Sequence, residues 1–304
     1  MNWKELNTIR TVDGSTGLPS VIHTVVYSRD GQYCLTGSAD RTIKLWNPRK
    51  DTFIKTYAEH GKDVLGIALP LNDNSRFASC GMDRSVLVWD VSTGRVVRRF
   101  NDHSQRVNAI DFNADASVVA SVSYDATMRL WDCRSQSRRP IQVVAAGKDS
   151  VESIQINGHE ILTGCTDGFI RIFDVRMGCV TQDSIGSPVT CTRFSNDKNC
   201  VLAVSLDNSI RLVDKESGEL LNSYSGHSNA HYRVMATMSY TDAHVIGGSE
   251  DGSVFMWDLV DASISSQFKA HSKSVTCIAY HPKSHEIITV SLDGLIKLWK
   301  QLTL

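Results

Sequence analysis

Three segments of the chain each combine a histidine, a serine or threonine, an aspartate and a tryptophan at similar spacing. These sets are His60/Ser79/Asp83/Trp89, His103/Ser121/Asp125/Trp131 and His271/Thr289/Asp293/Trp299. A histidine with an aspartate can perform general acid–base catalysis, but such a site occurs once in an enzyme, whereas this set recurs along the chain. We therefore interpret the sets as structural hydrogen-bonded networks, expect no catalytic residues and predict that the protein is not an enzyme.

Two histidine pairs have a spacing that metal sites also use, His227 with His231 and His281 with His285. Ligation at this spacing requires a helix and a third ligand, and Pro282 and the strand pattern oppose a helix. The eight cysteines are too scattered for a zinc site or a disulfide framework. The chain also lacks a glycine-rich phosphate loop and a G-x-S-x-G elbow, so we expect neither a metal nor a cofactor.

The aspartates of these sets belong to a longer series with a nearly constant interval of 40 to 44 residues. The series is Asp40, Asp83, Asp125, Asp167, Asp207, Asp251 and Asp293, and six residues after each comes Trp46, Trp89, Trp131, Phe173, Val213, Trp257 or Trp299. A fixed period of this length is typical of repeat architectures, in which each unit buries its apolar face against its neighbours. The period predicts seven such units.

Each repeat contains the pattern of four short strands. Apolar residues alternate at the third and fifth positions after every aspartate, which indicates one strand with a buried face. Two strands precede the aspartate, as in RVNAIDFN and VVASVS, and a fourth lies between repeats, as in TFIKTY. Four strands in about 42 residues form the blade of a β-propeller. The sequence therefore predicts an all-β, seven-bladed propeller that occupies residues 1–304 as one domain.

The last repeat supplies only three clear strands before the chain stops at QLTL. Residues 4–12 (KELNTIRTV) precede the first repeat and have the character of the strands between repeats. We predict that they form the outer strand of the seventh blade, so that the two ends of the chain close the ring.

The overall charge gives no sign of a nucleic-acid or membrane binder. The net charge is −1, charged residues make up 21% of the chain, and no apolar run is long enough to span a membrane. We expect no membrane partner and no direct DNA binding. The absence of an apolar signal core at the N-terminus favours a reducing compartment, the cytosol or the nucleus.

The segments LTGSADRTIKLWN, VLVWD, MRLWD, VFMWD and IKLWK resemble WD-repeat signatures. In WD repeats the aspartate, a loop histidine, a strand hydroxyl and the tryptophan bond together across the blade. The resemblance implies complete networks in repeats two, three and seven. Repeat six has Gly247 in place of the hydroxyl, and repeats one, four and five lack the histidine, so their networks stay open.

Further stretches, among them LWDCRS, EILTGCTDG, GSPVTCTRFS and LVDKESGELL, resemble the mitogen-activated protein kinase organizer family over nearly the whole chain. Members of this family are also called WD repeat-containing protein 83. The resemblance implies a non-enzymatic scaffold in a mitogen-activated protein kinase cascade and a component of spliceosomes in pre-mRNA splicing. It implies partners among spliceosomal factors and kinase-cascade components, indirect association with RNA, and residence in nucleus and cytoplasm. The alternative is an adaptor that presents substrates to another complex, such as a ubiquitin ligase.

Propeller geometry places the aspartate turns on one rim of the central channel, and loops on a rigid scaffold carry function. Large apolar residues precede four of the aspartates, arginines follow two of them, and further arginines begin two inner strands. With Tyr232 of the longer loop SNAHYR, these candidate partner-binding residues are Arg41, Met82, Arg84, Arg106, Tyr124, Leu206, Tyr232, Arg233 and Leu292. Arginine, methionine and aromatic residues are enriched in protein interfaces. The alternative is that they cap the turns without binding a partner.

A second candidate surface is a group of arginines around the third repeat. The group contains Arg95, Arg98, Arg99, Arg134, Arg138 and Arg139. Such a group could receive a phosphorylated or acidic segment or an RNA backbone, or it could be a solvated edge.

Overall fold

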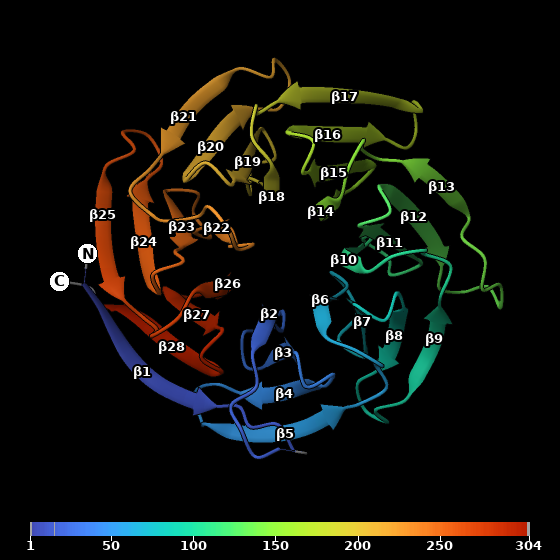
Figure 1. Ribbon diagram of the computed structural model, residues 1–304, viewed down its shortest axis with the longest axis horizontal. Helices are drawn as coiled ribbons and strands as arrows, with labels where there is room; N and C mark the ends of the chain where they lie inside the picture. The colour runs from blue at the N-terminus through green and yellow to red at the C-terminus, as the bar shows by residue number, and fades with distance from the viewer. Residues whose placement is uncertain (1, 15, 303–304) are drawn as a thin grey trace.

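The computed structural model describes residues 2–14 and 16–302, which form seven antiparallel sheets of four strands each. The sheets stand as blades around a central channel, in the order of the chain (Figure 1). The seven-bladed propeller predicted from the aspartate interval is confirmed. The described residues contain no helix, and therefore none long and apolar enough to cross a membrane.

The inner two strands of each blade come from the segments before the aspartate. The innermost strands of blades one to seven are β2 (Ile22–Tyr27), β6 (Val64–Ala68), β10 (Val107–Phe112), β14 (Val151–Asn157), β18 (Val189–Phe194), β22 (Ala236–Met238) and β26 (Val275–Tyr280). The second strands are β3 (Cys34–Ser38), β7 (Arg76–Gly81), β11 (Val118–Ser123), β15 (Glu160–Cys165), β19 (Cys200–Ser205), β23 (His244–Gly248) and β27 (Glu286–Ser291).

The outer two strands of each blade follow the aspartate. The third strands are β4 (Ile43–Asn47), β8 (Val86–Asp90), β12 (Thr127–Asp132), β16 (Phe169–Asp174), β20 (Ser209–Asp214), β24 (Ser253–Asp258) and β28 (Leu295–Leu302). The outer strands are β5 (Thr52–Tyr57), β9 (Val96–Phe100), β13 (Gln142–Ala145), β17 (Cys179–Ser184), β21 (Leu220–Tyr224), β25 (Ile264–Lys269) and, for blade seven, β1 (Asn2–Arg10).

Blade six differs from the others at its inner strand. In the other six blades the inner strand begins with a register shift of one residue against its neighbour, as between Val64 and Gly66. Strand β22 has only three residues and pairs with β23 without such a shift. The longer loop before β22 therefore takes up chain that the other blades use in the strand.

The core lies between neighbouring blades rather than inside any one of them. One buried cluster joins Val86 and Phe100 of blade two to Val107, Phe112 and Trp131 of blade three. A sheet of four strands cannot bury both of its faces alone, so each blade depends on the next for its apolar contacts.

The N-terminal strand closes the ring, as predicted. Strand β1 pairs antiparallel with β28, from Asn2 opposite Leu302 to Arg10 opposite Leu295, and the two strands lie side by side in Figure 1. The strand occupies residues 2–10 rather than 4–12 because β28 continues to Leu302 and gives the first residues a partner. After Arg10 the chain turns inward, where the hydroxyl of Thr11 donates to the carbonyl of Gly294 over 2.8 Å.

Ile9 is the buried anchor of β1, with 4% of its surface exposed, and it packs against Ile22, Trp46 and Ile296. We expect Ile9→Ala to lower the free energy of unfolding by about 2–5 kcal/mol, because it leaves a cavity at the ring closure. Leu6→Ala is the matched control, since Leu6 is 41% exposed on the same strand. Urea unfolding measures both, and equal stabilities of the two variants would contradict closure through β1.

Candidate functional site

The aspartate of each repeat lies in the turn between the second and third strands of its blade. The residue before it donates its backbone N–H to the loop that precedes the inner strand. This bond joins Met82 to Asp63 at 2.9 Å, Tyr124 to Arg106 at 3.1 Å and Leu292 to Ser274 at 3.2 Å. The turns and the inner-strand loops therefore share one face of the propeller, which we call the turn face.

The structure brings together the four residues of each complete polar set. His60 Nδ1 lies 2.9 Å from Asp83 and its Nε2 lies 2.7 Å from the Ser79 hydroxyl, which also accepts Trp89 Nε1–H at 2.7 Å. The same contacts connect His103, Ser121, Asp125 and Trp131 in blade three and His271, Thr289, Asp293 and Trp299 in blade seven. In each set the tryptophan donates to the hydroxyl, the ionised carboxylate accepts from one ring nitrogen of the histidine, and the other ring nitrogen bonds to the hydroxyl.

These networks have the residue types of a nucleophile with its base, but they are closed to a substrate. Ser79, Ser121 and Thr289 are each 0% exposed. Burial opposes ionisation of Asp83, yet hydrogen bonds from His60 and Ser85 hold the pKa of its carboxyl well below the usual range. The aspartate of each network is thus ionised, and the bonded network holds the turn against the inner-strand loop.

The blades without the histidine bond their aspartate to a cation four residues later. Asp40 pairs with Lys44 at 2.8 Å, Asp167 with Arg171 at 2.7 Å and Asp207 with Arg211 at 2.6 Å. The sequence alone does not predict which group bonds to the aspartate in these three blades. The basic residue is visible in the sequence, but Arg129 and Lys297 occupy the same position in two blades that have the histidine, so the position alone does not predict the pair.

Blade six has neither arrangement. Both ring nitrogens of His227 are buried without a partner among the described residues, and burial lowers the pKa of this histidine to about 4. Trp257 donates instead to the carbonyl of Ser225, at 3.0 Å. Replacing Gly247 with serine or threonine would force a neighbouring side chain to move, because a Cβ at this position would lie 2.9 Å from Ile210 Cδ1.

The histidine pairs considered as metal ligands point to different surroundings. His227 is buried, whereas the side chain of His231 is 80% exposed. The ring of His281 packs against Tyr27, and His285 lies beside Tyr240. Among the described residues there is no group of three or more His, Cys, Asp and Glu side chains placed to hold a metal ion.

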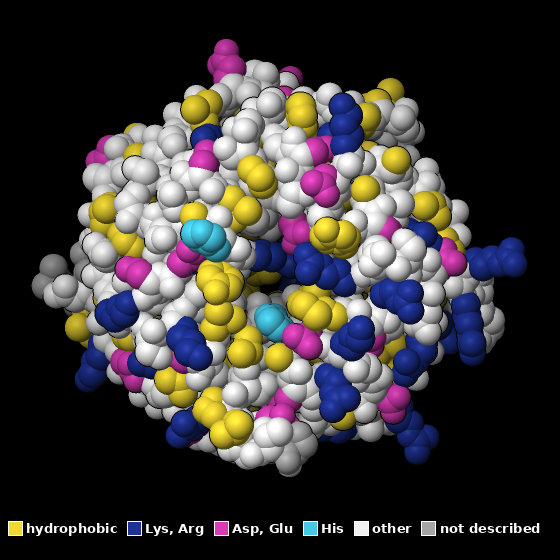
Figure 2. Space-filling view, viewed as in Figure 1, with side chains coloured by type: hydrophobic (Ala, Val, Ile, Leu, Met, Phe, Trp, Pro, Cys, Tyr) yellow, Lys and Arg dark blue, Asp and Glu magenta, His cyan; other side chains and the backbone are white. Residues whose placement is uncertain are grey.

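Four of the predicted partner-binding residues line one hollow on the turn face. Met82, Arg84, Arg106 and Tyr124 surround a space of about 690 Å³ between blades two and three. The guanidinium of Arg106 lies over the ring of Tyr124, 4.9 Å from its centre. In Figure 2 the Lys and Arg side chains gather on the side of the face that β6–β13 occupy in Figure 1.

The other five predicted residues are spread around the ring. Arg41 is exposed in blade one, and Leu206 and Leu292 are half-buried in blades five and seven. Tyr232 is 53% exposed. Arg233 lies on the wall of the central channel instead of on the rim, because its guanidinium donates to the carbonyl of Asn108 across the ring.

The longer loop of blade six is held by one carboxylate that sequence analysis did not single out. Glu250 Oε1 accepts the backbone N–H groups of Ala230, His231 and Tyr232, the first and last at 2.8 Å. The loop is therefore a preformed feature of the turn face, and it presents the side chains of His231 and Tyr232 to solvent.

Two family models match this chain, and several known relatives share one family name. The family model described as "Nucleolar protein 10-like, N-terminal domain" matches residues 19–239, and the "WD domain, G-beta repeat" model matches residues 262–300. The chain is 44% identical to WD repeat domain-containing protein 83 of Rattus norvegicus, over 97% of this chain and 92% of the relative. It is 42% identical to the Homo sapiens protein of that name, over 96% and 91%. The Dictyostelium discoideum homolog is 32% identical, over 91% and 94%.

The chain belongs to the WD repeat domain-containing protein 83 family. The resemblance stated from the sequence motifs is thus confirmed. A WD-repeat propeller of this family is consistent with a protein-interaction scaffold, and such propellers are typically non-catalytic.

The backbone of this family member is strained at two of the predicted partner-binding arginines. The residue after the aspartate has a positive φ, 67° at Arg41 and 66° at Arg84. Blades four, six and seven have glycine there, blade five has Asn208, and blade three has Ala126 with a φ of 63°. The conformation thus belongs to the turn of every blade, and side chains other than Gly and Asn adopt it at a cost. An arginine at these two turns costs stability and places a long cation on the turn face.

Two of the six arginines in the group around blade three form an ion pair. Arg99 pairs with Glu59 at 3.1 Å and Arg134 with Asp115 at 2.8 Å. Arg138 and Arg139 line a shallow hollow of about 280 Å³ that also contains Asp102. Asp102 itself pairs with Arg129, so Arg138 and Arg139 have no ion-pair partner among the described residues.

Thr289 and Thr163 occupy equivalent positions in blades seven and four, and both are 0% exposed. Thr289→Val strands Trp299 Nε1–H and His271 Nε2, whereas Thr163→Val removes a single bond of 3.5 Å to the Arg171 carbonyl. We expect the first substitution to lower the free energy of unfolding by about 2–4 kcal/mol and the second by about 1 kcal/mol or less. Denaturant unfolding of the two variants measures the difference. Equal losses would mean that the network adds nothing.

Stability should fall as pH falls below 4. Burial opposes ionisation of Asp293 and Asp167, but hydrogen bonds from His271 and Arg171 lower the two pKa values to about 2. Because the folded pKa lies below the unfolded value of about 3.9, this stabilisation is complete above that value and is lost toward pH 2. Urea unfolding between pH 5 and pH 2.5 measures the slope. Asp293→Asn should flatten it, and a slope unchanged by this substitution would contradict the assignment.

Proposed function

We propose that this protein is a non-enzymatic scaffold that binds protein partners through its turn face, over blades one to three. The observation that carries the proposal is the hollow lined by Met82, Arg84, Arg106 and Tyr124, with Arg41 exposed in the next blade. Arginine, methionine and tyrosine are the side chains that contribute most to protein interfaces.

The unpaired arginines of the first two turns support this choice of face. Arg41 and Arg84 occupy positions where glycine would be more stable, and no ion pair within the described residues involves either of them. The two guanidinium groups are therefore available to an external partner. An acidic segment of a partner protein fits the two cations.

We propose further that the partners are spliceosomal factors, together with components of a mitogen-activated protein kinase cascade, in nucleus and cytoplasm. The support is the family resemblance carried by motifs such as LWDCRS and GSPVTCTRFS. A net charge of −1 favours association with RNA through the proteins of the complex rather than by direct contact.

The test is affinity purification from nuclear and cytoplasmic extracts with the double variant Arg41→Glu/Arg84→Glu. Both side chains are exposed, so the fold should be retained while bound partners fall at least severalfold. The control is Arg138→Glu/Arg139→Glu on the outer edge of blade three, which should keep the partners. Unchanged recovery with the first variant would move the interface to another face. Recovery of kinases without splicing factors or small nuclear RNAs would remove the splicing proposal.

A further inference from the structure

The central channel contains a cavity of about 250 Å³, and positive charges outnumber negative ones among its lining residues. The inner strands of several blades surround it, and most of the side chains that line it are small or apolar. Three of its lining residues carry a formal charge, Asp111, Arg193 and Arg233. Figure 2 shows the hollow at the centre of the face, with Lys or Arg side chains at its wall.

Arg233 enters this cavity from the long loop of blade six. Its Nη1 donates to the carbonyl of Asn108 in blade three, over 2.9 Å, which holds the side chain across the channel. Its Nε is buried and has no hydrogen-bond partner among the described residues. The hydrogen bond from Nη1 thus fixes the guanidinium of Arg233, and its Nε–H remains free to donate to another group.

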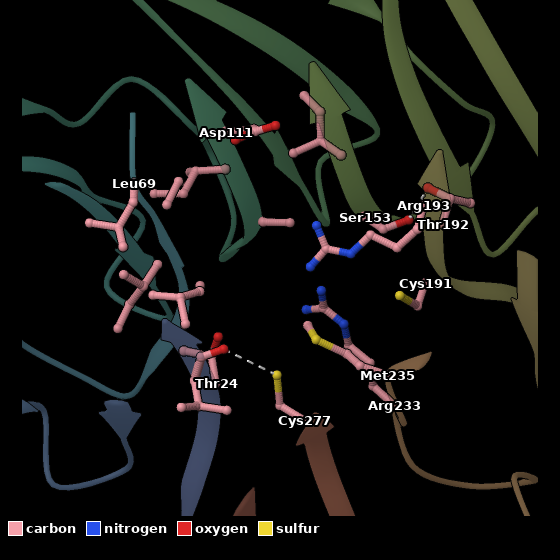
Figure 3. A pocket seen from close by; sticks show the side chains of 18 of the residues that line it. Thr24, Leu69, Asp111, Ser153, Cys191, Thr192, Arg193, Arg233, Met235 and Cys277 are labelled. Carbon is pink, nitrogen blue, oxygen red and sulfur yellow. Dashed lines mark hydrogen bonds between the residues drawn. The ribbon is translucent and has the colours of Figure 1, made fainter. Parts of the chain in front are cut away.

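Arg193 enters from β18 of blade five. It is half-buried, and it forms no hydrogen bond or ion pair with the residues that the structure describes. In Figure 3 the guanidinium groups of Arg193 and Arg233 point toward the same space in the middle of the channel. Burial raises the pKa of the Cys277 thiol on the wall, and the charges of both arginines oppose that rise.

Asp111 offsets only part of this positive charge. Its carboxylate is committed to the backbone, accepting N–H groups from Ile156 at 2.7 Å and Phe112 at 2.9 Å. Among the other polar groups on the wall, the hydroxyls of Ser153 and Thr192 lie 2.8 Å apart and Cys277 bonds to Val25, whereas the buried Tyr27 hydroxyl has no partner among the described residues. Two cations therefore face one carboxylate, and both cations keep free N–H donors.

We propose that the channel binds the phosphate group of a small anionic molecule between Arg193 and Arg233. Two guanidinium groups that converge on one space match the geometry of a phosphate, which accepts paired N–H donors from arginine. Both arginines are half-buried, which strengthens the attraction to an anion compared with an exposed pair. The anion would bridge blades five and six and, through Arg233, blade three.

The test is isothermal titration of the full chain with inorganic pyrophosphate, at an ionic strength held constant with potassium chloride. Saturable binding of one pyrophosphate per chain is expected. Arg193→Gln should weaken it on the order of tenfold or more, because it removes one charged donor pair. This variant should fold, since Arg193 forms no bond to the described residues, and thermal melting without pyrophosphate checks this.

The matched control is Arg84→Gln, which removes an arginine from the turn face outside the channel and should leave pyrophosphate affinity unchanged. Absence of saturable binding to the wild-type chain would overturn the proposal. Equal affinity of wild type and Arg193→Gln would also overturn it, as would a loss of affinity only in Arg84→Gln, which would place the anion on the rim.

Discussion

The structure depends on giving a partner to the aspartate that each blade partly buries in its turn. A carboxylate removed from water is costly unless it is hydrogen-bonded or paired. Three blades meet this requirement with a histidine joined to a hydroxyl and a tryptophan, and three with a lysine or arginine four residues later. In blade six the carboxylate of Asp251 accepts the N–H and the hydroxyl of Ser253, and the backbone carbonyl of Asp251 accepts from Lys269.

The need to bond each aspartate also determines which residues lie on the turn face. A bonded aspartate fixes its turn, and the residues on either side of it then project from one face in every blade. The scaffold is thus repetitive while its surface is not, since Tyr124 is exposed at a position where Met82, Leu206 and Leu292 are half-buried. Blade six departs most from the repeat, with an unpartnered His227 and a longer loop held by Glu250. That departure delivers Arg233 to the channel.

The sequence predicted the fold well because the features that determine it are periodic. The aspartate interval, the apolar alternation and the closing strand predicted at residues 4–12 all reflect backbone pairing, which repeats in every blade, although the strand lies two residues earlier, at Asn2–Arg10. The partners of the aspartates were harder to predict. Lys44 pairs with its aspartate, whereas Lys297, at the same position in blade seven, pairs with Glu5 of the closing strand. The direction of a long side chain depends on tertiary neighbours, so the sequence alone does not distinguish a rim position from a channel position for Arg233 and gives no signal for Arg193.

The central claim is that the turn face of blades one to three carries the protein's partners. Amide hydrogen exchange, compared between the free chain and the chain within an assembly purified from cells, tests it most directly. The account predicts slower exchange in the assembly at the turns around Arg41, Arg84 and Tyr124, with β13 and β17 unchanged. Protection confined to β13, β17 or the other outer strands, with the three turns unaffected, would contradict it.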